Sequence, residues 1–117
     1  PAQQVRTLIT RDYVQAFEKC DAILAPASPR TAFKFGEISD PAQMYLSDIF
    51  TVPINIAGNG GMTVPVGLGS QTGLPVGVQI IAQQFKDANM LRVAAALEQA
   101  YGTASVAPEF AGEKAGE

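Results

Sequence analysis

The residue with the clearest potential for chemistry is Asp48, a lone carboxylate within the segment 40–61. Apolar residues follow it closely, namely Ile49, Phe50, Val52, Ile54 and Ile56. An unpaired charge is costly to bury, so a carboxylate in an apolar setting needs a hydrogen-bonding or ionic partner. Two interpretations of Asp48 follow. It either accepts backbone N–H bonds from the loop after a helix, or it anchors a ligand that carries an amine.

The remaining side chains give no support for covalent catalysis. The sequence contains no histidine, which excludes a Ser–His–Asp or Cys–His arrangement and metal sites of the His/Cys type. No glycine-rich phosphate-binding motif opens a helix after a strand, and Gly58 and Gly60 are more typical of a turn. We therefore expect no catalytic residue, no metal site and no cofactor in this chain.

The composition is typical of a globular domain without a nucleic-acid-binding surface of its own. The net charge is −3, from 8 basic and 11 acidic residues, and the basic residues are scattered along the chain. Cys20 is the only cysteine and is expected to be a small packing residue. Because it cannot form an internal disulfide, it favours a reducing compartment, the cytoplasm. The apolar runs are too short to cross a membrane, and no membrane partner is expected.

Hydrophobic periodicity and chain-breaking residues predict the secondary structure. The expected elements are, in order, a helix at 2–19, a strand at 22–25, a helix at 41–49, strands at 62–68 and 74–82, and a helix at 87–101. Asp40 is a suitable N-cap for the second helix, with Pro41 in its first turn. The glycine-rich segment 69–73 joins the last two strands as a hairpin loop.

These elements predict an α/β fold with a mixed sheet. Three strands are few for an independent sheet, so we expect them to pair with strands that this chain does not supply. The domain portion is assigned to 1–102 and a flexible tail to 103–117, which is rich in small and acidic residues. The first residues are typical of the middle of a helix, so the chain is expected to be part of a longer one.

Three separated blocks of the sequence resemble a known family. They are RTLITRDYVQAFEKCDAILAPASPRTAFKFGE, DPAQMYLSDIFTVPINIAG and GLPVGVQIIAQQFKDANMLRVAAALEQA. With these blocks in this order, the chain from about Val5 to Tyr101 resembles the C-terminal end of the amidase signature family. The RTLI-R-D, AFKFGE and MYLSDI blocks resemble more narrowly the glutaminase subunits of the tRNA-dependent amidotransferases in that family.

The resemblance implies that this chain is the C-terminal part of an α/β/α sandwich built around a large mixed sheet. It implies a serine nucleophile, a second serine and a lysine in sequence upstream of Pro1, so the chain alone is expected to be inactive. Glutamine is the implied substrate, and amidotransferase subunits B and C are the implied partners. Misacylated tRNA, ATP and Mg²⁺ are expected at a partner subunit rather than in this chain.

The resemblance also implies a role for Asp48. In the block that matches MYLSDI, these glutaminase subunits use an aspartate to hold the α-amino group of glutamine, and the matching position here is Asp48. A carboxylate that faces an ammonium group forms a short, charge-assisted hydrogen bond. Two alternatives stay open: a segment of a general amidase that acts on other amides, and a non-catalytic interaction domain. One departure from close relatives is Asn59-Gly60-Gly61, where a proline-glycine pair is usual.

Overall fold

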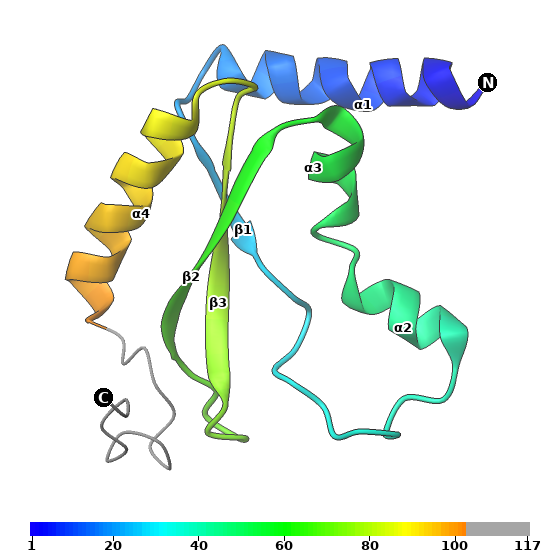
Figure 1. Cartoon of the computed structure of the whole chain (residues 1–117), viewed down its shortest axis with the longest axis vertical. Helices are drawn as coiled ribbons and strands as arrows, with labels where there is room; N and C mark the ends of the chain where they lie inside the picture. Colours follow the sequence, from blue (N-terminus) through cyan, green and yellow to red (C-terminus); the bar gives the residue numbers. More distant parts are fainter. Residues whose placement is uncertain (103–117) are drawn as a thin grey trace, which may run out of the picture.

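The structure, a computed structural model, describes residues 1–102, and the flexible tail predicted at 103–117 lies outside this part. The chain alternates helices and strands (Figure 1). The elements are α1 (Ala2–Phe17), β1 (Ile23–Pro26), α2 (Pro41–Ser47), α3 (Val52–Ala57), β2 (Gly60–Leu68), β3 (Pro75–Ala82) and α4 (Asp87–Tyr101).

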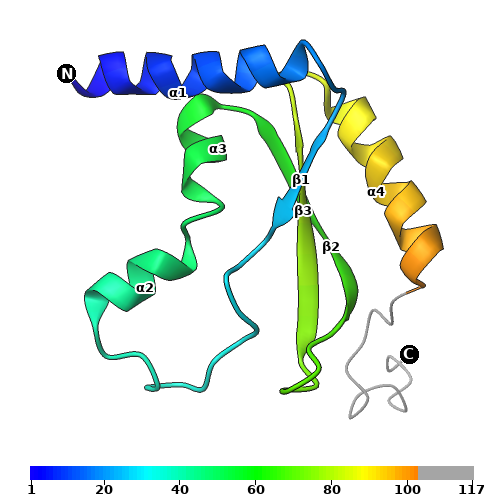
Figure 2. The same ribbon diagram turned by 180° about the vertical axis from the view of Figure 1, so that it is seen from behind.

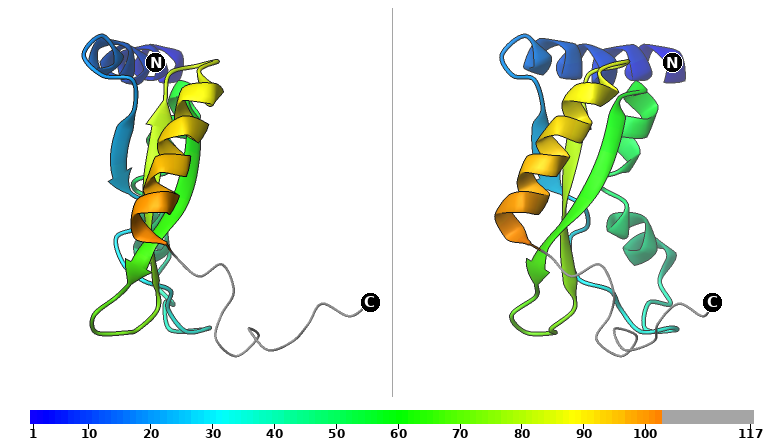
Figure 3. Two further views of the ribbon diagram at one scale, coloured as in Figure 1. Left: turned by 90° about the vertical axis from the view of Figure 1, so that its left-hand side faces the viewer. Right: turned by 60° about the vertical axis from the view of Figure 1, so that its left-hand side comes forward.

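The three strands form one sheet with helices on both sides. The strand order is β1-β3-β2, so β3 lies in the centre, and both pairings are antiparallel. Figures 1 and 2 show α4 on one side of the sheet, α2 and α3 on the other, and α1 across one end of the strands. The side view in Figure 3 shows α4 lying along the hairpin of β2 and β3. This arrangement is a small α/β/α sandwich.

The best-buried side chains lie between the sheet and α4. Ile80 of β3 is paired with Leu24 of β1 and Met62 of β2, and directly paired residues share a face of the sheet. Ile80 is fully buried and forms a core cluster with Val64 and with Ala94 of α4. Partly buried residues pack around this cluster, namely Ala22, Met62, Met90, Val93 and Leu97.

The opposite face of the sheet packs against α3. Ile54 and Ala57 are the buried residues of this helix, and Ile81 of β3 is buried with them. Close approach of α3 depends on Gly61 of β2, because a Cβ atom there would lie 2.5 Å from the Ile54 side chain. Helix α3 therefore sits directly on the sheet, and the chain that leads into it is held close to β3.

Helix α3 was not predicted from the sequence, which indicated only an apolar run. The alternation of Val52, Ile54 and Ile56 gives no helical period, so local patterning does not reveal the helix. Proline in its first turn and the left-handed Gly58, with φ of 74°, fix its two ends. Its buried residues pack against the sheet at Gly61, and the helix also contacts α1.

The observed sheet agrees in part with the sheet expected from the sequence. The α/β fold class and the hairpin between β2 and β3 are confirmed. The three described strands pair only antiparallel, so they do not by themselves make the mixed sheet that the element order predicted and the resemblance implies. Within residues 1–102, the outer edges of β1 and β2 have no partner strand. Whether strands from elsewhere pair with them stays a prediction.

The N-terminal helix keeps its apolar side largely uncovered. No residue of α1 is buried, and Val5, Leu8 and Val14 are 45–55% exposed. The expectation that Cys20 is a packing residue was wrong, because the side chain is exposed and its Sγ donates to the carbonyl oxygen of Ala16 at 3.3 Å. This exposure follows from the position of α1 at the end of the sheet, outside the two packed faces.

The predicted N-cap of α2 is confirmed and gives a first test. The backbone N–H of Ala42 donates to Asp40 Oδ1 at 2.9 Å. Replacing an N-cap aspartate with alanine costs about 1 kcal/mol, so Asp40→Ala should speed amide exchange in α2 about fivefold in the full-length protein. Hydrogen-exchange mass spectrometry measures this, with Asp40→Asn as the control that keeps the cap. Equal exchange in both variants would contradict the capping role.

Candidate functional site

Asp48 lies at the C-terminal end of α2, where the chain turns toward α3. It is the C-cap of α2, and its main-chain carbonyl accepts hydrogen bonds from Thr51 N at 3.0 Å and Val52 N at 3.1 Å. The hydroxyl of Thr51 donates to the same carbonyl at 3.1 Å. The main chain at Asp48 therefore closes a turn that connects the two helices.

Asp48 is exposed among the described residues, so the burial that would require a partner for its carboxylate is not met by this part of the chain alone. Within residues 1–102 it takes part in no hydrogen bond or ion pair, because the loop N–H groups bond to the main-chain carbonyl instead. Helix α2, which Asp48 ends, has no buried residue. This geometry leaves the carboxylate available to a cation from outside these residues.

Two glutamine side chains donate hydrogen bonds to main-chain carbonyl groups of the segment after Asp48. Gln79 of β3 is 3% exposed, and its Nε2 donates to the carbonyl oxygen of Phe50 at 2.9 Å. Gln84, just after β3, donates from Nε2 to the carbonyl oxygen of Ala57 at 2.7 Å. Sequence reasoning missed both residues. The available signal was a single amide side chain, Gln79, inside the otherwise apolar strand LPVGVQIIA.

The bend after α3 is held by a left-handed glycine, although the usual proline-glycine pair is absent. Gly58 has φ of 74°, and the backbone N–H of Asn59 donates to the carbonyl oxygen of Ile54 at 3.1 Å. The Nδ2 atom of Asn59 is buried and has no hydrogen-bond partner among the described residues. The turn from α3 into β2 is therefore formed with Asn59-Gly60-Gly61 in place of a proline-glycine pair, and Gly58 is its left-handed residue.

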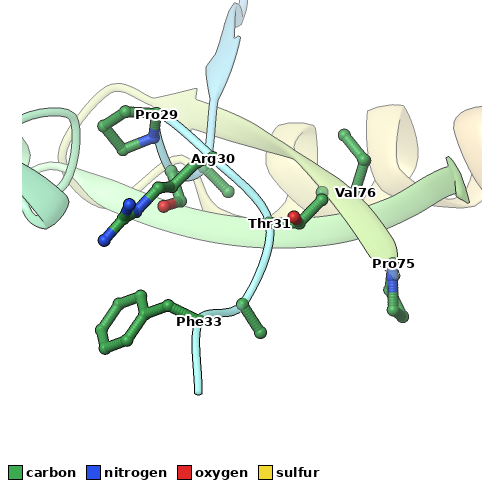
Figure 4. Close-up of a pocket in the computed structure, with 10 residues that line it drawn as sticks. Pro29, Arg30, Thr31, Phe33, Pro75 and Val76 are labelled. Carbon is green, nitrogen blue, oxygen red and sulfur yellow. The ribbon is translucent and has the colours of Figure 1, made fainter. Parts of the chain in front are cut away.

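A hollow lies between the loop after β1 and the start of β3 (Figure 4). Its volume is about 450 Å³, and its lining includes Arg30, Thr31, Phe33 and Val76. Figure 4 shows Arg30 and Phe33 extending to the same side of the loop, with the guanidinium 5.0 Å from the ring centroid of Phe33. The cation–π contact orients the arginine at the rim of this hollow.

A second hollow of about 320 Å³ continues from the same loop to α2. Its lining residues are Pro29, Arg30, Gln43, Leu46 and Ser47. Because Ser47 immediately precedes Asp48, this hollow reaches the end of α2 that carries the exposed carboxylate. Sequence reasoning did not select the lining residues, since they come together only through the path of the loop between β1 and α2.

The described residues form no metal site around Asp48. Across residues 1–102 there is no cluster of three or more side chains suited to hold a metal ion. No helix in the same part of the chain has the length and apolar character to cross a membrane. The exposed Asp48 carboxylate is suited to bind a positively charged group.

The sequence model of the Amidase family matches residues 1–91. The match covers more than half of the 117 residues, and the chain belongs to this family. A solved structure superimposes on the α/β/α arrangement described above. The resemblance seen in the sequence blocks is thereby confirmed.

Within this family, the chain is similar to the A subunits of glutamyl-tRNA(Gln) amidotransferases. The chain is 56% identical over 99 residues to the A subunit of the glutamyl-tRNA(Gln) amidotransferase of Geotalea daltonii, covering 84% of this chain and 20% of that protein. It is 52% identical over 101 residues to the corresponding protein of Acidothermus cellulolyticus, covering 86% and 20%. The crystal structure of the Thermotoga maritima counterpart superimposes with a TM-score of 0.77 at 47% identity, covering 82% of this chain and 21% of that one. The chain thus spans about a fifth of the length of these relatives.

Proposed function

We propose that this chain is a C-terminal segment of the glutaminase subunit of a tRNA-dependent amidotransferase, and that Asp48 holds the α-ammonium group of the glutamine substrate. The observation that carries the proposal is the exposed Asp48 carboxylate, which has no hydrogen-bond partner within residues 1–102. The similarity to the amidotransferase proteins of Geotalea daltonii and Thermotoga maritima supports the choice of glutamine over other amides.

The physical reason for the role of Asp48 is selectivity. A carboxylate and an ammonium group form a charge-assisted hydrogen bond that a simple amide, which lacks the ammonium group, cannot form. A site built to pair with a charged group rejects ligands without that group, because its own charge then stays unpaired. Asp48 would therefore contribute to the choice of substrate and not to bond cleavage.

The proposal assigns the reacting groups and the partners to other parts of the assembly. A nucleophilic serine, a second serine and a lysine in the longer protein would release ammonia from glutamine. Subunits B and C would be the partners, and one of these two would use the ammonia, ATP and Mg²⁺ to convert Glu-tRNA(Gln) to Gln-tRNA(Gln). The assembly would work in the cytoplasm, in agreement with a single cysteine that forms no internal disulfide.

The proposal is tested with the full-length protein that carries this segment. Together with subunits B and C, it should transfer the amide nitrogen of ¹⁵N-labelled glutamine to Glu-tRNA(Gln), as measured by mass spectrometry of the released aminoacyl group. The 117-residue chain alone should release no ammonia from glutamine. If the full-length protein hydrolyses simple amides readily but supports no tRNA amidation with its partners, the chain belongs to a general amidase instead.

A further inference from the structure

We propose that Gln79 is a positioning residue for glutamine binding, which acts by holding the turn that carries the Asp48 carboxylate. This inference rests on the proposed function and extends it to a residue on a different element. Gln79 does not touch the ligand in this proposal. Its effect reaches the ligand through the main chain of Phe50.

The first step of the argument is the place of Gln79 in the sheet. It lies on the central strand β3, paired with Ala25 of β1 and Thr63 of β2, and is 3% exposed. Its side chain lies on the face of the sheet that α3 covers, where Ile54 and Ile81 are buried, and an amide buried there is costly unless it is hydrogen-bonded. Among the described residues, Gln79 is the only buried residue with a polar side chain. The bond to Phe50 therefore accounts for a polar residue at this position.

The second step is the connection from Phe50 to Asp48. Phe50 lies inside the turn that the backbone N–H of Thr51 closes on the carbonyl of Asp48. Gln79 Nε2 donates a hydrogen bond to the Phe50 carbonyl oxygen at 2.9 Å, and this bond connects the turn to strand β3. Because no side-chain bond within residues 1–102 restrains the Asp48 carboxylate, the main chain of the turn sets its position. A small displacement of a binding group is enough to weaken a charge-assisted contact.

Gln84 offers a matched control in the same structure. Its side chain makes the same kind of bond, from Nε2 to the Ala57 carbonyl oxygen at 2.7 Å. This bond lies at the C-terminal end of α3, whereas the Phe50 bond lies before its N-terminal end. Loss of the Gln84 bond therefore removes a hydrogen bond of the same kind but leaves the bond between Gln79 and the turn at Asp48 in place.

The test measures steady-state kinetics of the full-length protein with its partner subunits. Gln79→Met, which keeps the side-chain length but removes the donor, should raise KM for glutamine about tenfold and leave kcat within about twofold. Gln84→Met should leave both constants within about twofold. Gln79→Asn is a second variant, whose shorter amide cannot span the distance to Phe50, and it should raise KM in the same way.

A second substrate separates positioning from general damage to the fold. Glutaramic acid, which has the amide and carboxylate of glutamine but no α-amino group, makes no contact with Asp48. Its KM should be unchanged in Gln79→Met. In an Asp48→Asn background, Gln79→Met should raise KM for glutamine no further, because the contact that it positions is already lost.

Three results would overturn the inference while the proposed function stands. They are an unchanged KM for glutamine in both Gln79 variants, an equal rise of KM for glutamine and glutaramic acid, and a fall in kcat with KM unchanged. A wild-type protein that hydrolyses no glutamine would instead overturn the proposed function, and this inference with it. The wild-type measurement therefore distinguishes the two failures.

Discussion

Replacing Asp48 with asparagine in the full-length protein is expected to raise KM for glutamine about 100-fold, with kcat little changed. The substitution keeps the shape of the side chain and removes its charge. A hydrogen bond to a charged group contributes about 1.5–3 kcal/mol, and the upper part of this range corresponds to about a hundredfold change in affinity. Because the Asp48 side chain forms no hydrogen bond among residues 1–102, the substitution removes no contact that holds this part of the fold.

Steady-state ammonia release, measured with glutamine and with glutaramic acid, checks this expectation. KM for glutaramic acid, which lacks the α-amino group, should be the same in the wild type and in Asp48→Asn. Asp40→Asn is the matched control, since it neutralises the carboxylate at the other end of α2 and keeps the N-cap bond to Ala42. If Asp48→Asn binds glutamine as well as the wild type does, Asp48 has only the structural role of closing α2.

The elements that the sequence predicted well are those with local signals. Asp40 and Pro41 mark the start of α2, and its structure confirms both. The bounds of α4 were predicted as observed, because Gly102 adopts the left-handed conformation that ends the helix. The hairpin of β2 and β3 follows from alternating apolar residues around a glycine-rich loop. Each of these signals lies within a few residues of the element that it defines.

Helix α3 and the setting of Asp48 could not be predicted because they depend on distant residues. Ile54 is buried against a strand that follows in sequence, and its terminal methyl group lies where a side chain at position 61 would be. The turn at Asp48 is held by Gln79, which lies on the central strand. Local patterning identified the carboxylate but not its exposure, since exposure depends on how α2 and α3 are placed by these contacts.

The second large effect is expected from Ile80, on the opposite face of β3 from Gln79. Ile80 is fully buried against Val64 and Ala94. Removing most of such a side chain costs about 2–5 kcal/mol, because apolar contacts are lost and a cavity is left behind. Ile80→Ala should therefore lower the urea midpoint of unfolding of the full-length protein strongly, as followed by circular dichroism.

Ile80→Val is the graded control for this prediction, because it deletes a single methyl group and should cost about 0.5–1.5 kcal/mol. A loss of equal size in the two variants would contradict cavity formation as the cause. Below its unfolding transition, Ile80→Ala should keep the wild-type KM for glutamine, since its face of the sheet packs on α4 and not on the turn at Asp48. Substitution of Ile80 would then lower stability, whereas substitution of the adjacent Gln79 would weaken glutamine binding. The two effects differ because successive side chains of a strand point to opposite faces.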